Sequence, residues 1–266
     1  METVGFILGI FCVYIFLIRI DSKRMGNHDK HIAPIAHRGL YSMDQQIPEN
    51  SLEAFKQAID SGYGIELDVQ LSSDLEAFVF HDTTLHRMCG SNKTFEKLRS
   101  NEIKDYRLKQ TDQTIPTLKE VLGLVEGKTT LWIEIKTTRR RAETVDQVLL
   151  LLRDYPGEFS LCSFDPLILR EIKKREPSIL RGIIVEGFLN NKKFPFYQRI
   201  IAHFSLLNFL VKPDYQSYDY HQRSNPTYLL NKIMGAYSLF WAVGSKDLEN
   251  KLKPDCDNVI FEHYRP

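Results

Sequence analysis

From Ile32 onward, short apolar segments alternate with stretches that have the length and spacing of helices. Several of the short segments are rich in β-branched residues and almost continuously apolar, which is typical of parallel strands buried on both faces. The nine strand candidates are 32–37, 64–70, 77–82, 131–136, 159–164, 181–186, 209–212, 239–243 and 258–262. Such alternation over roughly 230 residues predicts an α/β fold of the TIM (β/α)8 barrel type, with a doubly wound sheet as the structural alternative.

Two details of this pattern refine the prediction. Nine candidates exceed the eight places in a barrel, so one is wrong or peripheral, and 209–212 is the weakest. A helical crossover needs about a dozen residues, and the interval between Gln70 and Ala77 is too short for one. We therefore expect a hairpin that turns at 72–75 and distorts the barrel near its second and third strands. The predicted helices are 51–61, capped by Asn50, and 117–126, 143–153 and 166–175.

The N-terminal segment is apolar from Val4 to Ile18 and has no polar face. A helix needs only about 17–20 such residues to span a bilayer. No basic residue precedes the segment and no small-residue cleavage site follows it, which argues against a cleaved signal peptide. The sequence thus predicts a single-pass transmembrane anchor over residues 1–20.

The charges after this segment predict how the chain is organised. A polar linker over 21–31 would join the anchor to a barrel domain over 32–266. Basic residues follow the apolar run, so the positive-inside rule predicts that the barrel lies on the cytoplasmic side of the membrane that holds the anchor.

The net charge of +1 gives no sign of nucleic-acid binding. The four cysteines form no CxxC pair and are expected to be reduced thiols.

Ionisable residues interrupt four of the predicted strands where a buried strand should be apolar. They are His37, Arg38, Glu66, Asp68, His81, Asp82, Glu134 and Lys136. Side chains alternate across a strand, so Glu66 and Asp68 share one face, and Ile65 and Leu67 would meet the outer helices on the other. A hairpin turning at 73–74 would place His81 opposite Glu66.

Three carboxylates in a barrel interior are costly unless a cation offsets their charge. Glu66, Asp68 and Glu134 offer only oxygen ligands, which favours Mg²⁺ or Ca²⁺. Imidazoles titrate near neutral pH, so His37 and His81 suit general acid and base roles. The cations Arg38 and Lys136 can offset the charge of a phosphate.

Each of these residues taken alone has a structural explanation, such as a turn, a half-exposed strand face or a surface ion pair. Their occurrence on four successive buried strands is what favours a catalytic site. His86 and Arg87 are expected on the surface, and residues 139–141 at a solvated helix start.

The same residues resemble the glycerophosphodiester phosphodiesterase family. The matching motifs are Ala36-His37-Arg38-Gly39, Pro48-Glu49-Asn50-Ser51, Glu66-Leu67-Asp68-Val69, Phe80-His81-Asp82, Ile115-Pro116-Thr117-Leu118, Glu134-Ile135-Lys136, Ser163-Phe164-Asp165-Pro166 and Phe240-Trp241-Ala242-Val243. The resemblance implies that His37 and His81 are the acid/base pair, that Glu66, Asp68 and Glu134 hold the metal, and that Arg38 and Lys136 contact the phosphate. It also implies attack by the substrate's own glycerol hydroxyl, giving a cyclic phosphate that water then opens.

Two positions and the length of one stretch depart from the family pattern. Ser51 stands where Thr is frequent, and Gly244 stands where Asn commonly follows the late tryptophan strand. The stretch from Asp82 to Thr117 is shorter than the inserted subdomain of many members, which predicts a more open mouth.

These features lead to one principal hypothesis and two alternatives. The chain is expected to be a metal-dependent phosphodiesterase that hydrolyses glycerophosphodiesters to sn-glycerol 3-phosphate and an alcohol. One alternative is a lysophospholipase D-type hydrolase that acts on lysophospholipids. The other is a catalytically inactive, membrane-tethered protein that binds phosphodiesters.

Overall fold

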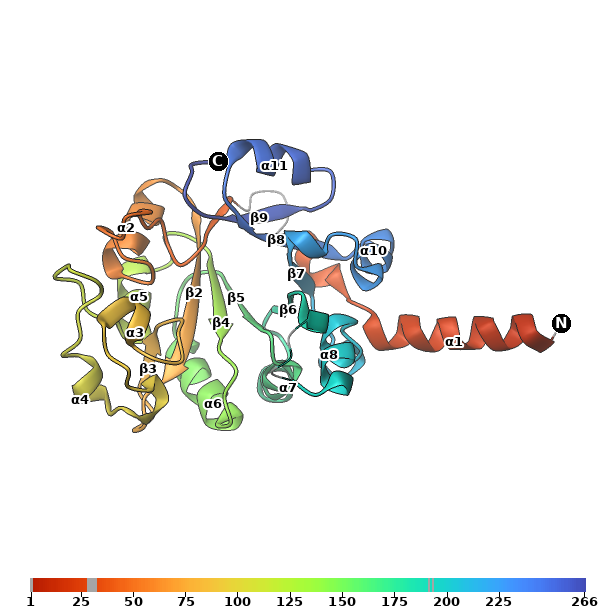
Figure 1. Ribbon diagram of the computed structural model, residues 1–266, viewed down its shortest axis with the longest axis horizontal. Helices are drawn as coiled ribbons and strands as arrows, with labels where there is room; N and C mark the ends of the chain where they lie inside the picture. Colours follow the sequence, from red (N-terminus) through yellow and green to blue (C-terminus); the bar gives the residue numbers. More distant parts are fainter. Residues whose placement is uncertain (1, 28–32, 191, 193) are drawn as a thin grey trace.

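The computed structural model describes residues 2–27, 33–190, 192 and 194–266 of the chain. Eight parallel strands form a closed barrel in the order β1-β9-β8-β7-β6-β5-β4-β2, and pairing of β1 with β2 completes the circle. Helices surround the barrel (Figure 1). The predicted TIM-type architecture is therefore confirmed.

Most predicted elements lie within a few residues of their expected positions. The strands are β1 (Ile35–Ala36), β2 (Gly64–Leu71), β3 (Ala77–Val79), β4 (Leu131–Ile135), β5 (Phe159–Ser163), β6 (Arg181–Val185), β7 (Tyr215–Asp219), β8 (Tyr237–Val243) and β9 (Asn258–Phe261). The helices are α1 (Glu2–Ile18), α2 (Leu52–Asp60), α3 (His86–Cys89), α4 (Ser100–Ile103), α5 (Leu118–Val125), α6 (Arg141–Leu152), α7 (Pro166–Arg175), α8 (Phe196–His203), α9 (Asn208–Val211), α10 (Pro226–Ile233) and α11 (Lys246–Leu252). Short 3-10 helices are η1 (Ser22–Asn27), η2 (Phe95–Lys97), η3 (Phe188–Asn190) and η4 (Tyr220–Gln222).

One strand prediction was wrong and one strand was missed. Residues 209–212 fall in helix α9 and its C-cap, not in a strand. The sixth barrel strand along the chain is instead β7, whose sequence Tyr-Gln-Ser-Tyr-Asp lacks an aliphatic run. Gln216 and Ser238 alternate with the inward-facing Tyr215 and Tyr237, so they lie on the helix side of the barrel wall, where they pair at 2.9 Å. The polar composition of this segment is the reason that the hydrophobic pattern did not predict a buried strand there.

The predicted hairpin between β2 and β3 is confirmed, with a different register. Strand β3 pairs antiparallel with β2 and stays outside the barrel. The pairs Val69–Val79 and Leu71–Ala77 show that the register differs by one residue from the expected one, so His81 does not lie opposite Glu66. The turn contains Leu75 at φ 70°, which shifts the pairing.

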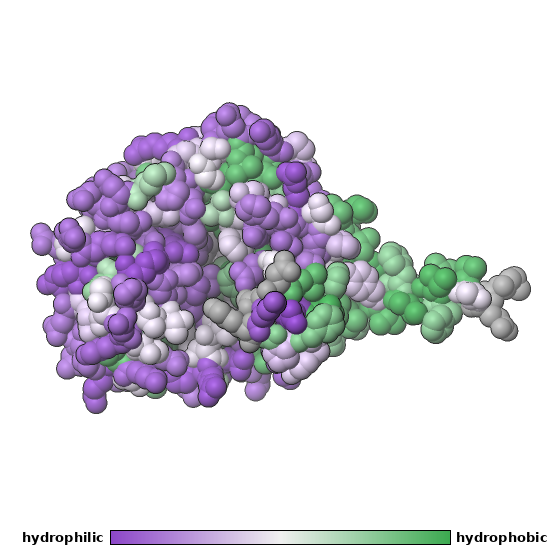
Figure 2. All heavy atoms as spheres, viewed as in Figure 1, coloured by the Kyte–Doolittle hydropathy of each residue, from purple (hydrophilic) through white to green (hydrophobic). Residues whose placement is uncertain are grey.

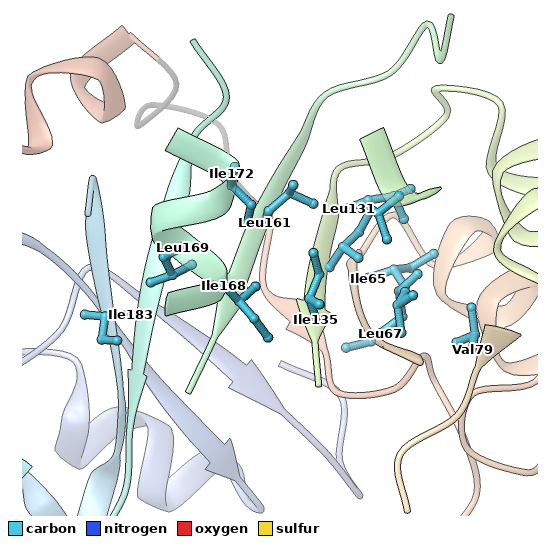
Figure 3. Packing of buried hydrophobic residues seen from close by; sticks show 14 of the residues in the cluster. Ile65, Leu67, Val79, Leu131, Ile135, Leu161, Ile168, Leu169, Ile172 and Ile183 are labelled. Atoms are coloured by element: carbon cyan, nitrogen blue, oxygen red, sulfur yellow. The ribbon is translucent and has the colours of Figure 1, made fainter. Parts of the chain in front are cut away.

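Apolar side chains form one layer outside the barrel wall and a second, smaller cluster inside it. The larger layer contains the strand residues Ile65, Leu67 and Leu161 together with helix residues such as Ile168 and Ile172, which belong to the α7 helix that packs on β5 (Figure 3). A smaller cluster inside the barrel consists of Met25, Ile35, Trp132, Cys162, Ile184, Tyr215, Tyr237, Leu239 and Ile260. The alternation predicted for β2 is thus confirmed: apolar side chains face the helices and the acidic ones face inward.

A third apolar cluster fills the short insertion after β3. Residues from Phe78 to Ile115, including the stacked rings of Phe80 and Phe95, form a small core of their own beside the barrel. This cluster holds α3 and the loop after β3 in place on one side of the barrel mouth.

Helix α1 projects from the barrel and carries mostly exposed apolar side chains (Figures 1 and 2). Its C-terminal end is attached: Ile18 is buried, and Tyr14 is 2.7 Å from Thr227. Among the described residues no helix is both long and apolar enough to cross a membrane, so the anchor predicted over 1–20 is not supported.

The predicted boundary between linker and barrel lies partly outside the described residues. Residues 28–31 of the linker and Ile32 belong to the part that is not described. The first half of the predicted linker forms η1, where Arg24 pairs with Asp214 at 2.6 Å. The domain division at 31–32 therefore stays a prediction.

Candidate active site

Three acidic side chains meet inside the barrel, as the sequence predicted. Asp68 on β2 is the direct neighbour of Glu134 on β4, and Glu66 lies two residues earlier on the same face of β2. All three are buried, and each offers one carboxylate oxygen within 4.8 Å of the others. Three oxygen donors at this spacing form a group that could hold a hard divalent cation.

Two cations contact these carboxylates. The Lys136 Nζ lies 2.7 Å from Glu134 and 3.2 Å from Asp68. The Arg38 backbone N–H donates to Glu66 at 3.0 Å, and its Nε lies 3.4 Å from Asp68. Three carboxylates against two cations leave the cluster with an excess of negative charge if all the groups are ionised.

The pKa values of the three acids reflect this imbalance. Burial raises the pKa of Glu66 well above its usual value, and the charges of Asp68 and Glu134 raise it further. Burial also raises the pKa of Glu134, partly offset by Lys136. Burial would raise the pKa of Asp68 too, but Lys136 and Arg38 outweigh it and lower the pKa. A raised pKa means that the ionised carboxylates lack enough positive charge beside them, which a bound cation would supply, so the donor set fits a divalent cation.

The loop after β1 presents His37 and Arg38 at the carboxyl end of the barrel. Arg38 has a positive φ of 55° and Gly39 one of 81°. A Cβ on Gly39 would approach the Ala54 carbonyl carbon to 2.9 Å, so only glycine fits there. The turn that directs His37 into the site thus depends on the glycine that follows.

Asn50 also belongs to this loop, but it does not cap helix α2 as expected. Ser51 is the N-cap and accepts from the Ala54 N–H at 3.1 Å. The Asn50 amide instead donates to Asp68 at 2.8 Å. The Pro-Glu-Asn-Ser motif therefore supplies both a hydrogen bond to the acidic cluster and the helix cap, from adjacent residues.

His37 is held by a carboxylate that sequence reasoning missed. Its Nδ1 lies 2.7 Å from Glu262, which follows β9 and also accepts from Tyr41 at 2.9 Å. Burial would raise the pKa of Glu262, but hydrogen bonds from His37 and Tyr41 lower it to about 2. An ionised Glu262 can only accept, so His37 carries its proton on Nδ1 and leaves Nε2 as an acceptor. Burial lowers the pKa of His37, which favours this neutral form.

His81 has an equivalent arrangement in the loop after β3. Its Nδ1 lies 2.7 Å from Asp82. Asp82 is also bound by Arg87, at 2.7 Å and 3.0 Å, so it does more than end a strand. Both predicted histidines are therefore oriented by a carboxylate on Nδ1.

A cavity of about 700 Å³ opens over these groups. Six of the seven predicted site residues line it: His37, Arg38, Glu66, His81, Glu134 and Lys136. Asp68 lies beneath the surface, 1% exposed. Arg141, the last residue of the predicted solvated stretch 139–141, lines the cavity and pairs with Asp165 at 2.6 Å, whereas Arg139 is exposed as expected.

Apolar side chains make up a large part of the remaining cavity lining. They are Phe164, Leu167, Phe188, Phe194, Ile201, Ala202, Leu207 and Trp241. The ring N–H groups of Trp132 and Trp241 are buried and lack a partner among the described residues. The cavity thus combines the charged residues of the site with a substantial apolar lining.

Two site contributors had weak or misleading sequence signals. Glu262 follows the last strand, and a carboxylate directly after a barrel strand was a signal that could have identified it. Arg87 was expected on the surface, and only the fold shows that it contacts both Asp82 and Glu49.

Comparison with known protein families agrees with the geometry. Residues 37–215 match the family model described as the glycerophosphoryl diester phosphodiesterase family. A glycerophosphodiester phosphodiesterase of Caldanaerobacter subterraneus is 34% identical over 57% of this chain and 66% of its own length. The human glycerophosphodiester phosphodiesterase 1 is 28% identical over 57% of this chain. The match spans 48% of the human protein, about half of its length.

Solved structures extend the similarity to the whole barrel. A phosphodiesterase of Oleispira antarctica, solved with its product sn-glycerol 3-phosphate, is 24% identical with a TM-score of 0.69, over 86% of this chain and 92% of that one. A glycerophosphodiester phosphodiesterase of Thermotoga maritima is 25% identical with a TM-score of 0.65, over 87% and 94%. On the family match over 37–215, this chain belongs to the glycerophosphoryl diester phosphodiesterase family.

Proposed function

We propose that this protein is a metal-dependent phosphodiesterase that cleaves glycerophosphodiesters to sn-glycerol 3-phosphate and an alcohol. The observation that carries the proposal is the juxtaposition of a buried carboxylate cluster with two carboxylate-oriented histidines in one cavity. Family membership and the similarity to a phosphodiesterase solved with sn-glycerol 3-phosphate support it.

The two histidines divide the proton transfers. His37 is neutral with a free Nε2, so it acts as the base that takes the proton from the attacking hydroxyl. His81 acts as the acid that protonates the oxygen of the departing alcohol. The substrate's glycerol hydroxyl forms the new P–O bond while the bond to the alcohol breaks, and water then opens the cyclic phosphate with the two roles reversed.

The charged residues bind the phosphate. Mg²⁺ or Ca²⁺ held by Glu66, Asp68 and Glu134 would supply positive charge to a phosphoryl oxygen. Arg38 and Lys136 line the cavity beside this cluster and donate to the other oxygens of the phosphate. Their existing ion pairs with the cluster keep both cations positioned before substrate binds.

The direct test is a panel of diesters assayed with chelator and after each metal is restored. Glycerophosphocholine, glycerophosphoethanolamine and lysophosphatidylcholine would be compared, with release of sn-glycerol 3-phosphate as the readout for the first two and release of choline as the readout for the third. We expect metal-dependent release from the deacylated diesters. Absence of turnover on every diester with either metal would reject an enzymatic function.

The apolar part of the cavity lining favours a second candidate, a lysophospholipase D-type activity. Phe188, Ile201 and Leu207 offer an environment for an acyl chain that a deacylated diester does not need. Product analysis separates the two candidates, because this activity would yield lysophosphatidic acid and choline from lysophosphatidylcholine. Turnover of the lysolipid alone would make it the principal function.

The pH profile tests the role of Glu262. Its hydrogen bond and charge raise the pKa of His37 against the effect of burial. In Glu262→Gln the pKa of His37 should therefore fall further, which moves the acidic limb of the kcat/KM profile to lower pH. The maximal rate should fall as well, because a weaker base results and the ring loses its fixed tautomer. A profile with an unmoved acidic limb would show that His37 is not the titrating base.

A further inference from the structure

Arg87 connects the two loops that carry the catalytic groups. It lies in α3, after the loop of His81, and its guanidinium donates to two carboxylates on opposite sides. Nε donates to Asp82 at 2.7 Å, and Nη1 donates to Glu49 at 2.7 Å. Nη2 donates to both, at 2.7 Å to Glu49 and 3.0 Å to Asp82. All three guanidinium nitrogens are therefore engaged.

The oxygens that Nη2 contacts are the ones that hold the catalytic side chains. Asp82 Oδ1 is the atom 2.7 Å from His81 Nδ1. Glu49 Oε1 is the atom that accepts from Arg38 Nη1 at 2.6 Å. Nη2 of Arg87 thus links Asp82, the partner of the proposed acid, to Glu49, the partner of the proposed phosphate-binding arginine.

We propose that Arg87 is a positioning residue that fixes His81 and Arg38 relative to each other. It occupies the second oxygen of each carboxylate, which leaves each with one orientation toward its catalytic partner. Without it Asp82 could rotate toward solvent, and the buried Glu49 would keep Arg38 as its only side-chain donor among the described residues. This inference rests on the proposed phosphodiesterase function.

The geometry requires arginine rather than a positive charge alone. A guanidinium presents a planar fork that matches two carboxylates at once, whereas an ammonium is a point charge on a flexible stem. The Arg87 side chain is 41% exposed, so an isolated ion pair there would contribute little to stability. The simultaneous pairing of Arg87 with Asp82 and Glu49 therefore orients these two carboxylates more than it stabilises the fold.

The test compares Arg87→Lys with wild type on the diester that the wild type turns over best. We expect kcat to fall about 10- to 100-fold, as for other residues that orient a site through its ligands. The activity should fall less with a diester whose alcohol is p-nitrophenol, because that leaving group needs little protonation. Arg87→Lys combined with Asp82→Asn should lose less than the product of the two single losses, since both changes act on His81 and only Arg87→Lys also acts on Arg38.

Arg175→Lys is the matched control. Arg175 also pairs with two carboxylates, Asp146 and Glu171, but it does not line the cavity. It should reproduce any change in Tm and keep the wild-type kcat. A wild-type kcat in Arg87→Lys, or losses that multiply in the double variant, would overturn the positioning role. An inactive wild type would instead refute the proposed function, so the two failures are distinguishable.

Discussion

Replacing His37 by alanine is expected to lower kcat by about 10²- to 10⁴-fold, the usual contribution of one general acid or base. The expectation rests on the position of the ring: Nδ1 is held by Glu262, and the residue lines the cavity. Glu262 and Tyr41 would remain, but no group would accept the proton from the attacking hydroxyl. His81→Ala should lower kcat by a similar factor, because the oxygen of the departing alcohol would no longer be protonated.

A surface histidine provides the control for this experiment. His86 is exposed at the start of α3, so His86→Ala should keep the wild-type rate. Added imidazole should restore part of the activity of His37→Ala, because a small base can enter the space that the side chain leaves. A rate within a few-fold of wild type in His37→Ala would refute the assignment of this residue as the base.

Removing the metal is expected to abolish turnover and to lower Tm. Binding at 100 times Kd stabilises a fold by about 2.7 kcal/mol, which for a chain of this size corresponds to roughly 5–10 °C in Tm. We expect such a rise when Mg²⁺ or Ca²⁺ is added to chelator-treated protein, measured by circular dichroism. The rise should be larger at higher pH, since burial raises the pKa of Glu66 and Glu134 and bound protons compete with the ion.

Variants of the cluster separate a specific ion from a general salt effect. Glu66→Gln removes one charged donor and should reduce both the Tm response and the activity. Glu171→Gln removes an acid that pairs with Arg175 and is not part of the cluster, so its response should equal that of wild type. A sodium salt at equal ionic strength serves as the second control. An unchanged response in Glu66→Gln would place the ion elsewhere.

Local patterns in the chain predicted much of the barrel and of its site. Buried strands appear as β-branched apolar runs, and the helices between them carry caps and amphipathic spacing. The strict alternation of side chains along a strand is enough to place Glu66 and Asp68 on one face. Neighbouring parallel strands end at the same side of a barrel, which is why the acids and histidines could be expected together.

The remaining features depend on contacts between distant parts of the chain. β7 is a strand because its backbone pairs with β6 and β8 and the Gln216 amide group donates to Ser238, although its composition is polar. The hairpin register was settled by the conformation of the turn, which a residue count cannot supply.

The sequence by itself determined which residues interrupt the buried strands and which face they share, because strand periodicity is local. Only the tertiary structure decided that Glu262 orients His37 from 225 positions away and that Arg87 joins the loops of His81 and Arg38. Such pairings depend on how the ring of strands closes, and no local spacing in the chain encodes that.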